Sequence, residues 1–122
     1  VTYYFNNYSA SEAWGVSPAN MVDGSISTYA TAAGASETQL NNGNTCPGTD
    51  LGTITKVELR IYAAEASATR YLYLRPVFGG SDDGDDHLVT VNYNQPGAWF
   101  AYQDITNDTN APSSWSWTDV QN

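Results

Sequence analysis

Turn-forming residues interrupt this chain at short intervals and leave room only for short strands. Asp23-Gly24, Asn42-Gly43 and Pro47-Gly48 are pairs that favour chain reversal. The abundant Ser, Thr, Asn and Asp residues compete with the backbone hydrogen bonds of a helix. Aromatic residues make up 13% of the chain and pack well on a pleated sheet. The sequence therefore predicts an all-β protein of short strands joined by polar turns.

Side-chain alternation locates the strands. It is clearest in residues 54–62, where Val57, Leu59 and Ile61 share one face and polar residues occupy the other. Other segments rich in β-forming residues lie between turn signals. We expect strands at about residues 2–5, 38–40, 54–62, 69–78, 87–93, 98–105 and 114–120. Short helical turns are expected only after Ser11 and at residues 18–22.

The aromatic residues of three expected strands are assigned to faces by the same alternation. Within 69–78, Tyr71 and Tyr73 point away from the leucines, and Pro76 marks an edge or a bulge because it cannot donate to a ladder. Within 98–105, Trp99 is predicted on the face opposite Tyr102. Within 114–120 the same rule predicts a shared face for Trp115 and Trp117.

These strands predict an antiparallel β-sandwich of jelly-roll type that forms a single domain over residues 1–122. The long polar loops precede Ile54 and the compact strands follow it. An immunoglobulin-like sandwich is disfavoured, because Cys46 is the only cysteine and the Cys-Trp-Cys framework is missing. Cys46 lies among turns without a nearby His or Cys, and we expect a partly exposed thiol there.

The net charge of −9 restricts the partners. Nucleic acid and anionic membranes are disfavoured, because both require clusters of Lys and Arg. We expect no membrane insertion, because no segment approaches the roughly 20 apolar residues of a membrane span. No signal peptide is recognised, so a secreted protein would be in its mature form here. Asn7-Tyr8-Ser9 and Asn107-Asp108-Thr109 are glycosylation sequons, which suggest that Asn7 and Asn107 carry glycans and that the protein is extracellular or surface-exposed.

Two loops are candidate cation sites. Gly24 lets the first loop turn sharply, so that the Asp23 carboxylate and nearby hydroxyls, including that of Thr28, approach one point. Ca²⁺ binds clusters of this kind of oxygen. The second loop places Asp82, Asp83 and Asp85 beside Asp86. These carboxylates repel one another unless a cation or water screens them, so the alternatives are a Ca²⁺ site and a solvated turn.

The segment Asn20-Met21-Val22-Asp23-Gly24, followed by Ser27-Thr28, resembles the discoidin and galactose-binding-like jelly-roll domains, which include carbohydrate-binding modules. The resemblance implies a structural Ca²⁺, with Asp23 and Thr28 supplying oxygens. The sequence departs from the pattern at Ala30, where a Trp is usual. Near the C-terminus, Asp119 is the nearest match to the Glu that often completes the cation shell. Such a domain is also expected to have another strand after Val120.

Catalysis is not expected. A nucleophilic triad needs a base beside Ser or Cys, and His87 is the only histidine, at the start of a strand after an acidic loop. Paired carboxylates serve glycosidases, but here the acidic residues gather in turns. We therefore expect a protein that binds or assembles rather than an enzyme.

The aromatic residues are the candidate binding surface. Burial in the core is the usual fate of such residues. Exposed rings would instead form a platform for sugar C–H faces or for another protein. The candidates are Tyr62, Tyr71, Tyr73, Trp99, Trp115 and Trp117. Two functions follow: a non-catalytic extracellular module that binds a glycan or a surface, or a structural subunit that pairs with copies of itself in a fibre, surface layer or virion appendage. An open sheet edge favours the second function.

Overall fold

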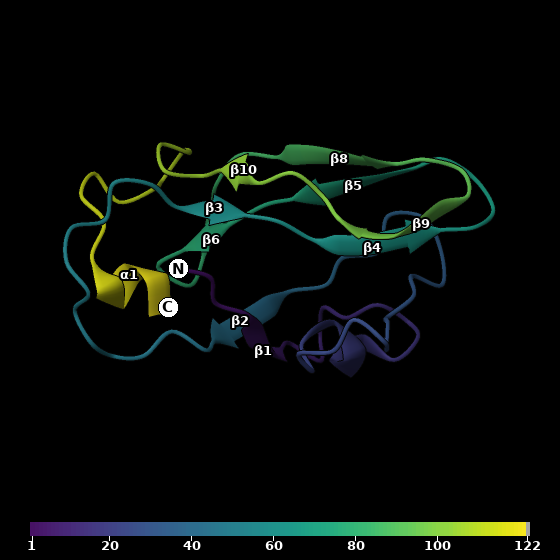
Figure 1. The fold of residues 1–122 in the computed structure, drawn as a ribbon, viewed down its shortest axis with the longest axis horizontal. Helices are drawn as coiled ribbons and strands as arrows, with labels where there is room; N and C mark the ends of the chain where they lie inside the picture. The colour runs from purple at the N-terminus through teal and green to yellow at the C-terminus, as the bar shows by residue number, and fades with distance from the viewer. Residues whose placement is uncertain (122) are drawn as a thin grey trace. The chain divides into compact units, whose positions relative to one another are not determined.

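The structure is a computed structural model that describes residues 1–121, and it is mostly β with very little helix (Figure 1). The strands are short. They are β1 (Phe5–Tyr8), β2 (Asn41–Asn44), β3 (Glu58–Leu59), β4 (Tyr62–Glu65), β5 (Arg70–Leu74), β6 (Val77–Phe78), β7 (Asp82–Asp83), β8 (His87–Val91), β9 (Gln95–Trp99) and β10 (Gln103–Asp104). The helices are a 3-10 turn at Pro18–Met21 and α1 at Trp117–Gln121.

Every sheet in the described residues is a two-stranded antiparallel pair. The pairs are β1–β2, β3–β10, β4–β9, β5–β8 and β6–β7. Figure 1 shows β4 beside β9 and β5 beside β8. The predicted β class and antiparallel pairing are therefore confirmed.

The chain divides into two compact units. The first contains Val1–Asp50 together with the C-terminal residues from Val120, and the second contains Leu51–Asp119. In the first unit β1 pairs with β2, and an isolated bridge joins Val16 to Thr31. The second unit contains the other strands.

The buried hydrophobic core belongs to the second unit. Val89 and Val91 on β8 are 3% and 2% exposed, and Ile105 is 4% exposed. Leu72 lies opposite Val89 in the β5–β8 register, so alternate residues of this pair face the core. The predicted alternation of residues 69–74 is thus observed. None of the described residues of the first unit is fully buried.

Several predicted strands are shorter or shifted. The strand at 54–62 divides into β3 and β4, with Arg60 and Ile61 between them. The strand at 69–78 divides into β5 and β6 around Pro76, which has no N–H to donate. Residues 98–105 divide in the same way between the end of β9 and β10.

The N-terminal strands are displaced along the chain. β1 covers Phe5–Tyr8 rather than residues 2–5, and β2 follows the segment predicted at 38–40. Both strands are rich in Asn, which is depleted in strands generally. Their backbone pairing, with Phe5 opposite Asn44, prevails over intrinsic propensity.

Three predicted turns contain strands. Asn42-Gly43 lies within β2. Asp82–Asp83 in the acidic loop pairs with Val77–Phe78, and Gln95 and Pro96 belong to β9 rather than to a turn.

The strand predicted at 114–120 is wrong, because α1 occupies Trp117–Gln121. The backbone N–H and the hydroxyl of Ser116 both donate to Asp119 Oδ2, at 2.7 and 2.6 Å, and the N–H of Asp119 donates back to Ser116 Oγ at 3.3 Å. This reciprocal arrangement is a capping box that starts a helix.

Within residues 1–121, no helix has the length and apolar character needed to cross a membrane.

Candidate functional site: aromatic surfaces and a charged network

The outer face of the β5–β8 pair presents two tyrosines. Tyr71 lies opposite Thr90 and Tyr73 lies opposite Leu88, so these four side chains share the face that points away from Val89. Tyr71 is 63% exposed, Tyr73 61% and Leu88 49%. Residues two apart on one strand are about 6.8 Å apart, so the rings form a row along the strand. We call Tyr71, Tyr73, Leu88 and Thr90 the tyrosine face.

A second aromatic group forms where β4 meets β9. Tyr62 lies directly opposite Trp99, and their rings meet edge to face, with centroids 5.5 Å apart and planes at 76°. A Cβ on Gly97 would lie 2.6 Å from the Tyr62 hydroxyl oxygen, so the tyrosine ring covers the glycine backbone. Trp99 remains 41% exposed. Gly97 thus leaves the space that this pair of rings needs.

Arg60 joins Trp99 to Tyr102. The central guanidinium carbon lies 4.4 Å from the centroid of each ring. The prediction that Trp99 and Tyr102 face opposite ways is therefore wrong. Leu59 pairs with Gln103 and Tyr62 with Trp99, so the second strand carries one more residue between these pairs than the first. An extra residue of this kind reverses the alternation locally.

Trp115 and Trp117 are held by hydrogen bonds inside the second unit. The indole N–H of Trp115 donates to the Thr106 carbonyl at 2.9 Å, and that of Trp117 donates to the Gly52 carbonyl at 2.7 Å. Trp115 also meets Phe78 edge to face at 5.7 Å. Both tryptophans are half-buried and they have different partners, so they do not form the predicted common face with each other.

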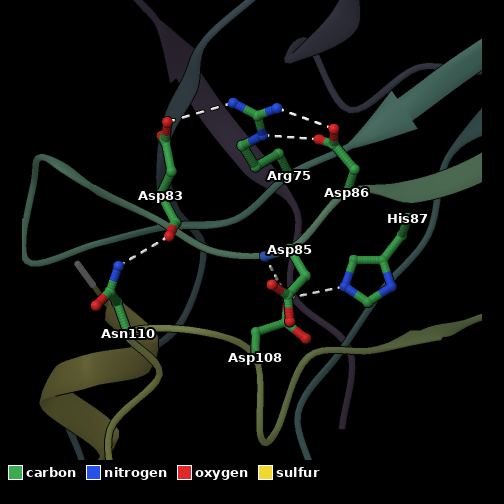
Figure 2. A network of polar contacts seen from close by, with 7 residues as sticks. All are labelled: Arg75, Asp83, Asp85, Asp86, His87, Asp108 and Asn110. Carbon is green, nitrogen blue, oxygen red and sulfur yellow. Dashed lines mark hydrogen bonds and ion pairs between the residues drawn. The ribbon is translucent and has the colours of Figure 1, made fainter.

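The acidic loop is organised by Arg75, as Figure 2 shows. Its Nε–H and Nη2–H donate to the two oxygens of Asp86 at 2.7 and 2.9 Å, and Nη1–H donates to Asp83 at 3.3 Å. The hydrogen bonds to Arg75 lower the pKa of Asp86, and those to Asp86 raise the pKa of Arg75. The screening cation for two of these carboxylates is therefore a side chain of the protein.

Asp108 ties the acidic loop to the loop after β10 (Figure 2). One of its oxygens lies 2.8 Å from His87 Nε2 and accepts the backbone N–H of Asp85 at 3.3 Å. The Asp108 side chain is 6% exposed. In return, Asp85 accepts the N–H of Thr109 at 3.2 Å, and the Asn110 amide donates to the Asp83 carbonyl at 3.0 Å. The network thus fixes the position of a loop that would otherwise be a charged, open turn.

Gly84 makes the close approach in this network possible. A Cβ there would lie 2.6 Å from Pro76 and 2.9 Å from the Phe78 ring. The N–H of Gly84 donates to the Pro76 carbonyl at 2.9 Å. The acidic loop therefore packs against the start of β6, where any larger residue would displace it.

The Asp23 loop closes on itself. Asp23 Oδ2 accepts the Thr28 hydroxyl at 2.5 Å, and Oδ1 accepts the N–H of Ser25 at 2.8 Å. These hydrogen bonds, that of Thr28 first, lower the pKa of Asp23. Gly24 has φ of 76°, which fits the predicted sharp turn. The structure thus brings together Asp23 and Thr28, as the sequence predicts.

Neither predicted Ca²⁺ site gathers a set of acidic side chains around one point in the described residues. Asp23 is the single carboxylate of its loop. In the described part of the chain, no three or more His, Cys, Asp or Glu side chains gather in a way that holds a metal ion. A Ca²⁺ at Asp23 would draw its other ligands from Thr28 and backbone carbonyls. Calcium binding at Asp23, or at Asp82, Asp83 and Asp85, stays a prediction.

Asn7 on β1 and Asn107 after β10 are both exposed, so neither sequon is hidden by the fold. Cys46 is a free, partly exposed thiol.

Sequence reasoning missed the roles of Tyr102 and Asp108. Tyr102 joins Arg60 only because of the extra residue between β9 and β10, which no local pattern marks. In the sequence, Asp108 is marked only as the middle residue of the Asn107 sequon. Its contact with His87 spans 21 residues, and such a separation leaves no periodic signal.

Comparison with protein-family models, with curated proteins and with solved structures finds no match to this chain.

Proposed function

We propose that this chain is a non-catalytic extracellular module that binds a glycan, free or on a surface, through its exposed aromatic side chains. The observation that carries the proposal is the tyrosine face, where Tyr71 and Tyr73 stand 63% and 61% exposed on one strand. The C–H faces of a sugar stack on such rings, while its hydroxyls reach the phenol groups. A row of rings along a strand suits an extended glycan better than a single sugar.

The net charge of the chain limits the classes of ligand that the tyrosine face can bind. The net charge of −9 repels a polyanion, and no Lys or Arg belongs to the face. Neutral glycans are therefore the ligand class that we propose for this face.

The fold and location belong to the same proposal. We propose a β-sandwich of jelly-roll type, similar to discoidin and galactose-binding-like domains and exposed outside the cell. The antiparallel pairs and the closed Asp23-Gly24 loop support this arrangement. The two exposed sequons are consistent with an extracellular location.

We propose that the chain is not catalytic because of the environment of His87, its only histidine. Its Nε2 lies 2.8 Å from Asp108, and both side chains are largely buried, at 17% and 6% exposure. Within residues 1–121, His87 has no hydrogen bond to a serine, threonine or cysteine side chain. The pair therefore acts as a structural tie between two loops.

A glycan array tests the proposal. We expect the full chain to retain neutral glycans, and the double variant Tyr71→Ala/Tyr73→Ala to bind them at least about tenfold more weakly, a loss of about 1.4 kcal/mol. Tyr29→Ala is the matched control, because Tyr29 is 76% exposed and lies in the other unit. An unchanged binding pattern in the double variant, or the same loss in Tyr29→Ala, would contradict the proposal.

The second candidate is a self-assembling structural subunit, and a specific observation favours it. Each described sheet has two strands, and a two-stranded sheet leaves outer edges open to a further strand. No described residue of the first unit is fully buried, so a second copy would supply the cover that this unit lacks. Sedimentation velocity over a range of concentrations tests this candidate. Ordered polymers support it and count against a monomeric module, whereas a monomer at every concentration contradicts it.

A further inference from the structure

Arg60 differs from the other cationic side chains of the chain. The Lys and Arg residues number four, and three form ion pairs: Lys56 with Glu58, Arg70 with Glu65, and Arg75 with Asp86. In the described residues Arg60 forms none. Its Nε is buried and has no hydrogen-bond partner there. A charged group with an unpaired buried donor is costly, and an acceptor supplied from outside would pair the guanidinium through its terminal Nη groups, since the buried Nε is out of reach.

The surroundings of Arg60 give its Nε–H no oxygen to bond. The guanidinium lies over the rings of Trp99 and Tyr102, each with its centroid 4.4 Å from the guanidinium carbon. Ring faces attract the positive charge but offer no lone pair to an N–H group. A guanidinium has five N–H donors in one plane, and a carboxylate matches this plane with two parallel hydrogen bonds.

The rings beside Arg60 are partly exposed. Trp99 is 41% and Tyr102 45% exposed. Tyr62 and Trp99 meet edge to face, and the Tyr62 ring covers Gly97 on the strand of Trp99. A cation between half-exposed rings can hold a ligand that has both an acidic group and an apolar face.

We infer that Arg60, Trp99 and Tyr102 form a second binding site, specific for a sugar that carries a carboxylate, such as a uronate. Arg60 pairs with the carboxylate, and the sugar ring packs on the exposed part of Trp99 or Tyr102. The inference takes its ligand class from the proposed glycan binding, but its residues lie outside the tyrosine face.

The charge of the whole chain indicates how densely the carboxylates are spaced in the ligand. One cation neutralises one carboxylate, whereas the net charge of −9 repels a polymer with an acid on every sugar. The site therefore favours an isolated uronate within a largely neutral glycan.

Nuclear magnetic resonance of the full chain tests the inference. Glucuronate and galacturonate are titrated to millimolar concentrations, with glucose and galactose as neutral counterparts. We expect either uronate to shift the Nε–H signal of Arg60 and the indole N–H signal of Trp99, and the neutral sugars to bind at least tenfold more weakly. Equal responses to neutral and acidic sugars, or no response to either uronate, would overturn the inference.

Variants separate the site from its alternatives. Arg60→Lys keeps the charge but loses the planar fork, so we expect uronate affinity to fall at least tenfold. Arg70→Lys is the matched control, because Arg70 is 61% exposed and paired with Glu65. The affinity of the Arg70→Lys variant for uronate should equal that of the wild type. Equal uronate affinity in Arg60→Lys and the wild type would overturn the inference.

Two further outcomes are informative. Signals that move with protein concentration and not with uronate would show that an acidic side chain of a second copy occupies the site, which also overturns the inference. The variant Tyr71→Ala/Tyr73→Ala should retain the uronate response, so failure of the tyrosine face and failure of the Arg60 site are distinguishable.

Discussion

Single side chains set the ends of elements in this protein. Ser116 and Asp119 exchange hydrogen bonds at the start of α1, and the bond from Ser116 lowers the pKa of Asp119. Asp23 closes its loop by accepting hydrogen bonds from the Thr28 hydroxyl and the Ser25 N–H. Short polar side chains therefore provide order where hydrophobic burial is small.

Removing the cap of α1 should destabilise the second unit. Ser116→Ala removes the hydroxyl that pairs with Asp119, and loss of such a cap costs about 1 kcal/mol. Urea unfolding of the full chain measures the change. Ser114→Ala, an exposed serine outside the helix, is the control and should leave the free energy of unfolding unchanged. Equal stability of Ser116→Ala and wild type would contradict the capping role.

Glu65 should make stability depend on acid pH. Hydrogen bonds from the backbone and hydroxyl of Ser67 lower the pKa of Glu65 from 4.5 to about 2. A carboxyl with a lower pKa in the folded chain contributes stability that is fully present above its unfolded pKa. That contribution is lost as pH falls from about 4.5 towards 2.

Glu65→Gln tests this dependence. The variant should lose less stability than wild type between about pH 5 and pH 3, in urea unfolding at each pH. Several other carboxyl groups also have lowered pKa values, so the slope should lessen and not vanish. They are Asp23, Asp86, Asp104 and Asp119. A variant with the wild-type slope would contradict the role of Glu65.

At the scale of elements, strands were predictable where alternation and pairing agree. The face of Tyr71 and Tyr73 follows from period two alone, and the register with β8 confirms it. Alternation gave the wrong faces for Trp99 and Tyr102, because the segment between β9 and β10 has one more residue than the segment that it pairs with. This extra residue is recognised only when the pairing with β3 and β4 is known. Pairing partners far apart in sequence are set by the whole fold, so local patterns do not reveal them.

The C-terminal element shows a different failure. Trp115 and Trp117 fit a strand by alternation, yet Ser116 and Asp119 carry the spacing of a capping box. The capping-box spacing was therefore visible in the sequence, and it predicts the observed helix better than the alternation of the two tryptophans predicts a strand. At the candidate site the exposed tyrosines were predictable, whereas the Arg60 cluster and the Asp108 tie depend on long-range contacts.

Gly97 should be essential to the second aromatic group. In Gly97→Ala the new Cβ would lie 2.6 Å from the Tyr62 hydroxyl oxygen and 2.9 Å from its Cε1, so the ring must shift and its contact with Trp99 is disturbed. Loss of an edge-to-face pair costs about 0.5–1.5 kcal/mol and should alter the near-ultraviolet circular dichroism. Gly34→Ala is the control, because its nearest neighbour would be 3.8 Å away. An unchanged aromatic spectrum in Gly97→Ala would contradict this packing.

At the scale of the molecule, the buried hydrophobic core of the described residues is small and consists of Val89, Val91 and Ile105. Loops are held instead by polar ties, such as Arg75 with Asp86 and His87 with Asp108. Several large side chains, among them Tyr29, Tyr71 and Tyr73, remain exposed.

Calcium binding is tested on the whole chain by thermal melting. A cation bound only to the folded state raises the melting temperature, so a Ca²⁺-holding Asp23 loop should melt at a lower temperature in excess EDTA. Asp23→Asn should abolish the difference between Ca²⁺ and EDTA, whereas the exposed residue Asp50, changed to Asn, should preserve it. A wild-type melting temperature that is the same in Ca²⁺ and EDTA contradicts the prediction.

The central claim is that the tyrosine face binds a glycan, and the most direct measurement follows the tyrosine rings themselves. The full chain with isotope-labelled tyrosine rings is titrated with the neutral glycan that the array retains. The ring signals of Tyr71 and Tyr73 should shift together and saturate, while those of Tyr29 stay fixed. A glycan that shifts Tyr29 and leaves Tyr71 and Tyr73 unmoved, or an array that retains no glycan, would contradict the claim.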